Sequence, residues 1–228
     1  MYRNRRAAIA ILLSLLFTSS WAYANDQHRS TTLMADLSVA APGLDRSVLQ
    51  HAISAMECAL QDGANAAERL AVIDFSLPSS KPRLWIFDLH TKQLVLKDLV
   101  AHGKGSGNNH ATSFSNVEGS HQSSLGLFRT AESYVGKHGY SLRMDGLEQG
   151  VNDLARERAI VIHGADYVDP AWISRQGRIG RSLGCPAVRS EIAQQVVDNL
   201  KGGQFLFSYY PDSGWLASSN LLNCPGSA

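Results

Sequence analysis

Short apolar runs separated by polar, turn-forming residues make up most of the chain from position 70 onward. Each run has the length of a β-strand and is rich in aliphatic or aromatic side chains. The runs are 70–75, 84–89, 93–100, 125–131, 159–162 and 204–210. Two other segments, 44–60 and 190–200, carry apolar residues at the three-to-four-residue spacing of one helical face. This pattern predicts a mainly β domain with a few helices.

Two stretches fit neither pattern well. Residues 101–124 are rich in Gly, Ser, His and Asn and contain few apolar side chains. They are too long for a routine connection between strands, so we expect a functional or mobile loop. Residues 146–158 show weak helical spacing.

Residues 1–24 have the composition of a secretory signal. Three arginines at positions 3, 5 and 6 precede an apolar stretch over 7–17, and Ala22-Tyr23-Ala24 is a small-x-small cleavage site. The apolar stretch is shorter than the roughly 20 residues that a membrane-spanning helix needs. We therefore expect export to the periplasm, cleavage after Ala24 and no stable membrane anchor. The polar and small residues of 25–44 are expected to form a flexible leader.

The charge balance argues against a polyanionic partner. Of the 21 basic residues three lie in 1–24, which contains no acidic residue, so the cleaved chain carries 18 basic against 20 acidic residues. A nucleic-acid-binding protein would show a basic patch or stripe. No such stretch follows the signal, and we expect no nucleic-acid partner.

Three cysteines are an odd number for an exported chain, because an oxidising compartment pairs structural thiols. Cys185 has the most specialised surroundings of the three. We therefore interpret Cys185 as a free, working thiol, and Cys58 and Cys224 as candidates for a disulfide between the N-terminal helix and the C-terminal tail. The alternative is that Cys185 is a structural cysteine, buried or bonded to one of the other two.

The segment from 160 to 189 carries the most specific pattern in the chain. His163 follows an apolar run and precedes Gly164, and Ser182-Leu183-Gly184-Cys185-Pro186 lies further along. A cysteine attacks as the thiolate, and a nearby histidine can accept its proton. Gly184 permits a backbone conformation with positive φ and Pro186 fixes the chain direction, so the motif suits an elbow that presents the sulfur. The N–H groups of Gly184 and Cys185 are candidate oxyanion donors.

These residues resemble the signature of the YkuD-like L,D-transpeptidases of bacterial cell walls. That signature is His-Gly, a loop, then Ser/Thr-x-Gly-Cys followed by an arginine, and 123–128 resembles the Thr-Pro-x-Gly-x-Phe strand upstream. The resemblance covers roughly 84–210, and Gly-Arg-Ser-Leu-Gly-Cys-Pro is similar to a less-studied branch. Leu183 replaces the common histidine, Pro186 and Ala187 follow the cysteine, and the arginine is displaced to Arg189.

The resemblance implies a β-sandwich catalytic domain over 70–212, preceded by a packing helix over 45–65 and followed by a tail over 213–228. It also implies cleavage of a tetrapeptide stem of peptidoglycan before its terminal D-alanine, through a thioester. Transfer to an amine gives a 3-3 crosslink, and transfer to water makes the enzyme an L,D-carboxypeptidase. No metal or organic cofactor is expected, and the oligomeric state is left unassigned.

The roles implied for individual residues follow the motif. Cys185 and His163 are expected to be catalytic, and Ser182 and Gly184 to shape the elbow. The residues expected to contact substrate are Arg189, Gly164 and Tyr140. In this family a backbone carbonyl often orients the histidine, while Asp166 or Asp169 is the alternative here.

Two other functional hypotheses remain open from the sequence. The first is a cell-wall-binding module without catalysis. The second is a zinc peptidase that uses His102, His110, His121 and His163, although their spacing matches no zinc-ligand motif. The simpler interpretation of the first three histidines is that they belong to a solvated or substrate-lining loop.

Overall fold

The computed structural model describes residues 30–224 and shows a mainly β domain with short helices, which confirms the predicted fold class. The strands are β1 (Arg69–Asp74), β2 (Leu84–Asp88), β3 (Gln93–Asp98), β4 (Val100–Ala101), β5 (Gly126–Gly136), β6 (Gly139–Gly146), β7 (Val161–Gly164), β8 (Ala187–Val188) and β9 (Phe205–Tyr209). The helices are α2 (Arg46–Gln61), η1 (Lys104–Ser106), α3 (Pro170–Gln176), η2 (Ser190–Ile192), α4 (Ala193–Leu200) and α5 (Ser213–Ser218), besides a helix over 30–40.

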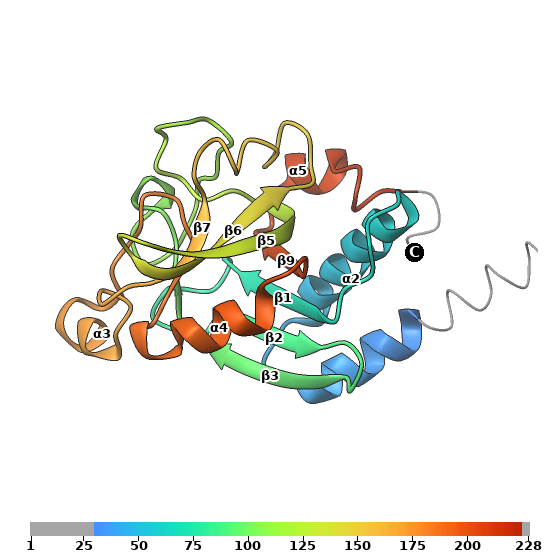
Figure 1. Cartoon of the computed structure of the whole chain (residues 1–228), viewed down its shortest axis with the longest axis horizontal. Helices are drawn as coiled ribbons and strands as arrows, with labels where there is room; N and C mark the ends of the chain where they lie inside the picture. Colours follow the sequence, from blue (N-terminus) through green and yellow to red (C-terminus); the bar gives the residue numbers. More distant parts are fainter. Residues whose placement is uncertain (1–29, 225–228) are drawn as a thin grey trace, which may run out of the picture.

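All nine strands form one sheet in the order β3-β2-β1-β9-β5-β6-β7-β8-β4. The pairs β1–β9 and β7–β8 are parallel and the others are antiparallel. The two ends of this order, β3 and β4, are consecutive in the chain and only Leu99 separates them. The sheet therefore curls until its two ends meet, and it is nearly a barrel (Figure 1).

Two arginines form contacts across the seam, which is the place where β3 and β4, the two ends of the sheet, meet. Arg83, directly before β2, is fully buried, and its guanidinium donates to the carbonyl of Val100 in β4 at 3.1 and 3.0 Å. Arg189, directly after β8, forms a two-bond ion pair with Asp98 at the end of β3, at 2.8 and 2.6 Å. Each contact joins a group near one edge of the sheet to a group near the other.

Helix α2 forms where the apolar spacing predicts a helix. The Asp45 side chain accepts from the N–H of Ser47 at 2.7 Å and caps its N-terminus. Its apolar face packs against β1, β5 and β9, while α4 packs against β1, β6 and β7 (Figure 1). Strands β1 and β9 are buried almost throughout, as expected for strands that are covered on both faces.

The flexible leader predicted over 25–44 is wrong for most of its length. Residues 30–40 are helical, and Met34 and Leu37 are buried in the main core. These two buried apolar side chains lie about one helical turn apart and pack the helix against the domain. The residues around them are mostly polar or small, so the sequence shows no clear apolar face. The proposed signal over 1–24 lies outside the described residues.

The segment predicted over 146–158 is not a helix: Gly146 ends β6, and 149–159 form a series of turns. The Asn152 side chain donates to the carbonyls of Leu125 and Leu127 and accepts from the N–H of Glu148. These bonds tie the segment to the start of β5, so side-chain hydrogen bonds decide its conformation. The hairpin of β5 and β6 was also missed, because its turn residues and polar strand ends lack a clear alternation.

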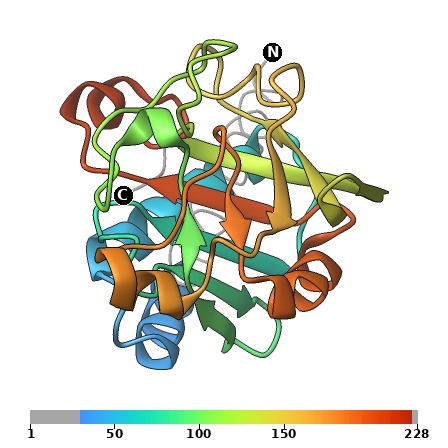
Figure 2. The same cartoon turned by 90° about the vertical axis from the view of Figure 1, so that its left-hand side faces the viewer.

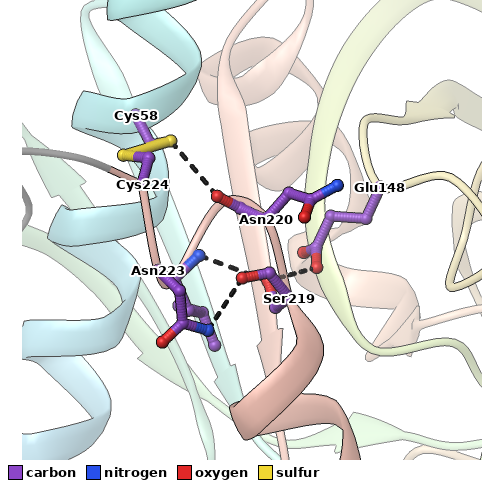
Figure 3. The surroundings of a disulfide bond; sticks show 7 residues. Cys58, Glu148, Ser219, Asn220, Asn223 and Cys224 are labelled. Atoms are coloured by element: carbon purple, nitrogen blue, oxygen red, sulfur yellow. Dashed lines mark hydrogen bonds between the residues drawn. A yellow bond between two sulfur atoms is a disulfide. The ribbon is translucent and has the colours of Figure 1, made fainter.

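The C-terminal segment packs onto the domain. In α5, Trp215 is buried and donates from Nε1 to Glu148 at 3.0 Å. A disulfide then joins Cys224 to Cys58 of α2, with the Asn220 carbonyl beside the Cys58 sulfur (Figure 3). Cys185 carries a free thiol. Between 30 and 224, no helix combines the length and the apolar character that a membrane crossing requires.

Removing the disulfide should destabilise the protein, because the bond joins positions 166 residues apart. Loss of a native disulfide typically costs about 2–5 kcal/mol. We expect a Cys58→Ala, Cys224→Ala variant to unfold in urea with a free energy lower by this amount. Adding a reductant should weaken the wild type and leave the variant unchanged. Equal midpoints for the oxidised wild type and the variant would contradict the stabilising role.

The Arg189–Asp98 pair should contribute more than an ordinary surface ion pair, because the side chains are only 30% and 12% exposed. A double-mutant cycle with Arg189→Met and Asp98→Asn is expected to give a coupling free energy of about 1–3 kcal/mol. The matched control is Lys201–Asp198, whose side chains are 48% and 41% exposed, with an expected coupling of about 0.5 kcal/mol. Similar values for both pairs would show that Arg189 does not close the seam.

Candidate active site

His163 lies on β7, opposite Ser141 of β6 and Ala187 of β8, and its side chain is buried. Its Nδ1 is 2.8 Å from the carbonyl oxygen of Gly164. Because a carbonyl only accepts, Nδ1 carries the proton and Nε2 has the free lone pair of a base. The Gly164 carbonyl therefore orients the ring. The alternative partners are used elsewhere, since Asp166 accepts from Ser190 and Asp169 caps α3.

The sulfur of Cys185 lies at the beginning of the same strand. It is 3.4 Å from the N–H of Val161 and 3.7 Å from the carbonyl oxygen of Ala159. A protonated thiol can donate to that carbonyl, and a thiolate can accept from that amide. Val161 and His163 are two residues apart in β7, so their side chains point to the same face of the sheet. The structure thus brings the sulfur to the edge of the strand that carries His163.

Ser182 and Gly184 give the elbow its shape. The Ser182 hydroxyl donates to the carbonyl of Cys185 at 2.6 Å and accepts from the N–H of Gly184 at 3.1 Å. Gly184 has φ +130°, and a Cβ there would lie 3.0 Å from the Gln122 carbonyl oxygen. The expectation that the Gly184 N–H faces an oxyanion is wrong, because Ser182 already binds it. The N–H of Cys185 remains as the candidate donor of the predicted pair.

The loop over 101–124 packs directly against this elbow (Figure 2). Ser123 accepts from the N–H of Gly103 and donates to the carbonyl of Gly184, both at 3.0 Å. A Cβ at Gly103 would overlap the His121 carbonyl oxygen and lie 2.8 Å from the Cα of Gly184. The loop is therefore part of the site, as the sequence suggested, and holds the elbow by backbone contact.

His102 has a structural position in this loop. It is fully buried, and Nη2 of Arg83 lies 2.7 Å from its Nδ1. Since arginine only donates, Nδ1 is the acceptor, and burial followed by the Arg83 charge lowers the pKa of His102 to about 3. His110, by contrast, is exposed. Within 30–224, no three His, Cys, Asp or Glu side chains are grouped so that they could bind a metal ion.

Burial shifts the pKa values of both members of the candidate pair toward the uncharged form. Burial raises the pKa of Cys185 above its usual value, opposed first by the Val161 N–H and then by the Arg158 charge. Burial also lowers the pKa of His163, against the effect of the Gly164 carbonyl and together with a smaller effect of His138. An uncharged imidazole is the form that can accept a thiol proton.

The three residues predicted to contact substrate make contacts within the domain, and their role toward substrate stays a prediction. Gly164 faces α4, where a Cβ would lie 2.8 Å from the Cβ of Ala193. The Tyr140 hydroxyl donates to Asp198 of α4 at 3.1 Å, on the face of the sheet opposite His163. Arg189 is held by Asp98 at the seam. All three residues make contacts that support the domain. The direction in which their side chains point depends on strand pairing, which is not visible in the sequence.

Three other residues lie near the pair and were missed. His138, in the turn between β5 and β6, stacks on His163 with ring centroids 4.5 Å apart. Tyr167 has its pKa raised to about 12 by burial and by the Cys185 charge. Arg158 acts electrostatically on Cys185 from the turn before β7. None of them belongs to a motif, so only the fold identifies them.

The buried His102 should make stability depend on pH. Its folded pKa of about 3 lies below the ordinary value of about 6.5, so the unfolded chain binds the proton first as the pH falls. The contribution is thus complete above about pH 6.5 and is lost progressively toward pH 3. Urea unfolding between pH 7 and 4 should show a smaller loss of free energy in His102→Gln than in the wild type, by up to about 1 kcal/mol per pH unit.

The matched control for this experiment is His110→Gln, which changes an exposed histidine of the same loop. We expect it to keep the wild-type dependence on pH. If His102→Gln also kept that dependence, the neutral state of His102 in the folded protein would be ruled out.

A comparison with known protein families finds a match. The sequence model of the L,D-transpeptidase catalytic domain matches residues 40–209. The match covers most of the chain, and it includes both members of the candidate pair. No curated protein matches the sequence.

Several solved structures are similar in part. The L,D-transpeptidase from Mycobacterium smegmatis is 14% identical with a TM-score of 0.39, over 64% of this chain and 60% of that one. The L,D-transpeptidase from Stackebrandtia nassauensis is 11% identical with a TM-score of 0.38, over 71% and 67%. By its family match over residues 40–209, the chain belongs to the L,D-transpeptidase catalytic domain family.

Proposed function

We propose that this protein is a peptidoglycan L,D-transpeptidase in which Cys185 is the nucleophile and His163 the base. The observation that carries the proposal is the position of the Cys185 sulfur, 3.4 Å from the first N–H of the strand that bears His163. The sulfur is free, and the Gly164 carbonyl leaves Nε2 of His163 unprotonated. A free thiol and a histidine nitrogen that can accept its proton are two of the requirements of a cysteine acyl-transfer enzyme.

The first half-reaction forms the acyl-enzyme. Nε2 of His163 accepts the thiol proton, and the thiolate of Cys185 attacks the carbonyl carbon of the third stem residue. The Cys185 N–H would stabilise the resulting oxyanion. The imidazolium then protonates the nitrogen of the terminal D-alanine, the C–N bond breaks, and a thioester and free D-alanine remain.

The second half-reaction consumes the thioester. His163 accepts a proton from the incoming amine of a neighbouring stem, the amine forms an amide with the acyl carbon, and the C–S bond breaks. The thiol regains its proton from His163. The product is a 3-3 crosslink. Water in place of the amine would give the L,D-carboxypeptidase reaction with the same residues in the same roles.

The cellular setting is part of the proposal. A cleavable signal over 1–24 would deliver the enzyme to the periplasm, where peptidoglycan stem peptides lie. A disulfide between Cys58 and Cys224 is compatible with that oxidising compartment.

Replacing Cys185 should abolish the cleavage of the stem peptide and leave the fold intact. We expect Cys185→Ala to release no D-alanine from a disaccharide-tetrapeptide, while the wild type gives products that mass spectrometry resolves. A dimer would identify the transpeptidase, and a tripeptide alone the carboxypeptidase. The circular dichroism spectrum should match the wild type. An active and well-folded Cys185→Ala variant would exclude the mechanism.

Alkylation distinguishes an active enzyme from a wall-binding module without catalysis. Iodoacetamide should modify the wild type at Cys185 in the unreduced protein, because the other two cysteines are bonded to each other. Modification should remove activity in step with labelling. A wild type that binds peptidoglycan, forms no product and resists labelling would support the wall-binding module instead.

A further inference from the structure

Arg158 occupies an unusual place for a charged residue. It lies in the turn that leads into β7, next to Ala159, whose backbone is in the left-handed region with φ +52°. A non-glycine residue in that region is uncommon. The turn directs the Ala159 carbonyl toward the Cys185 sulfur, 3.7 Å away. The same turn brings Arg158 to the site.

The guanidinium of Arg158 is bound at four points, all within residues 115–124. Nη1 donates to the Ser115 carbonyl and the Ser124 hydroxyl, both at 2.6 Å. Nη2 donates to the Gln122 carbonyl at 2.7 Å and to the Ser120 hydroxyl at 3.3 Å. These bonds fix the charged group and tie the loop to the turn before β7.

None of these four acceptors is a carboxylate. Arg156, two residues earlier, bonds to Asp145 and Glu132, and Arg189 bonds to Asp98. The charge of a half-buried arginine is costly unless an anion offsets it. The positive charge of Arg158 is therefore not neutralised by its direct partners, and it can act on an anion that forms nearby.

The Cys185 sulfur is placed to be that anion. A Cβ at Gly184 would lie 3.7 Å from Nη2 of Arg158, so the guanidinium adjoins the residue before the nucleophile. The Arg158 charge lowers the pKa of Cys185, and the Cys185 charge in turn raises the pKa of Arg158. Burial shifts each pKa in the opposite direction and is the larger cause for both groups.

We propose that Arg158 is the positioning residue of the nucleophile, which anchors the 115–124 loop beside the elbow and stabilises the thiolate of Cys185 by its charge. The proposal rests on the proposed function in one respect, namely that Cys185 reacts as a thiolate.

The competing interpretation is that Arg158 only braces the loop. A role through charge and a role in bracing the loop predict different effects on the pKa of the Cys185 thiol. A lysine at 158 keeps the positive charge but cannot make four bonds in the geometry of a guanidinium. A glutamine keeps some hydrogen bonding but has no charge. The thiol pKa therefore distinguishes the two roles, because bracing alone gives lysine and glutamine the same effect.

The experiment is the rate of iodoacetamide labelling of Cys185 between pH 5 and 10 in the unreduced full chain, without substrate. We expect Arg158→Gln to raise the thiol pKa by about one unit or more. Arg158→Lys should keep it within half a unit of the wild type while unfolding at lower urea concentration. Arg156→Gln, the matched control on the exposed side of the same segment, should change neither the thiol pKa nor the labelling rate.

An unchanged pKa in Arg158→Gln, or an equal rise in the glutamine and lysine variants, would overturn the proposal. If Arg158→Gln does not fold, the lysine variant alone tests the proposal. A folded Arg158→Lys whose thiol pKa lies well above that of the wild type overturns the proposal. A thiol pKa within half a unit of the wild type supports it. Because no peptidoglycan is present, these results are independent of the Cys185→Ala test. Either proposal can fail while the other stands.

Discussion

The site depends on three backbone segments that meet with almost no side chain between them. Gly103, the carbonyls of His121 and Gln122, and Gly184 approach so closely that a Cβ on either glycine would collide or press on its neighbours. Close contact of this kind leaves little freedom, because any displacement of one segment must move the other two. The sulfur is therefore presented by a rigid frame although all three segments are loops.

The curled sheet is what brings these loops together. Strand β4 leads into the loop that contains Gly103, and its partner β8 follows the elbow directly. Arg83 binds β4 and also touches His102, so one buried cation fastens the seam and fixes the residue next to Gly103. A neutral His102 suits this position, since a second positive charge against a buried guanidinium would be repelled. The stability of the fold and the geometry of the elbow at Cys185 thus depend on the same contacts.

Much of this organisation could be predicted from local patterns. The apolar spacing of α2, its cap at Asp45 and the strand that ends near His163 follow from side chains that interact within a few residues. The pair of cysteines that form the disulfide could be selected because the third cysteine lies in a distinctive motif. The loop over 101–124 stood out by its length and composition, which natural chains rarely tolerate without a purpose.

What could not be predicted depends on strand pairing and on distant partners. Tyr140 and Ser141 are neighbours in sequence, yet only Ser141 shares a face with His163. Arg189 was assigned to substrate because its partner Asp98 is 91 residues away in the chain. Arg158 follows a segment with weak helical spacing, and nothing nearby indicates that four acceptors from 115–124 surround it. The bond from the Gly184 amide to the Ser182 hydroxyl depends on the folded shape of the elbow, which the motif alone does not give.

The disulfide also changes how the molecule responds to proteolysis. Cys58 lies in α2 and Cys224 beyond α5, so all nine strands of the sheet lie within the covalent loop that they close. A protease that cuts a single exposed connection, for example between α3 and the elbow, leaves both pieces attached to each other. They stay at high effective concentration and can remain associated through the sheet. One cut within this loop is then not equivalent to loss of the protein.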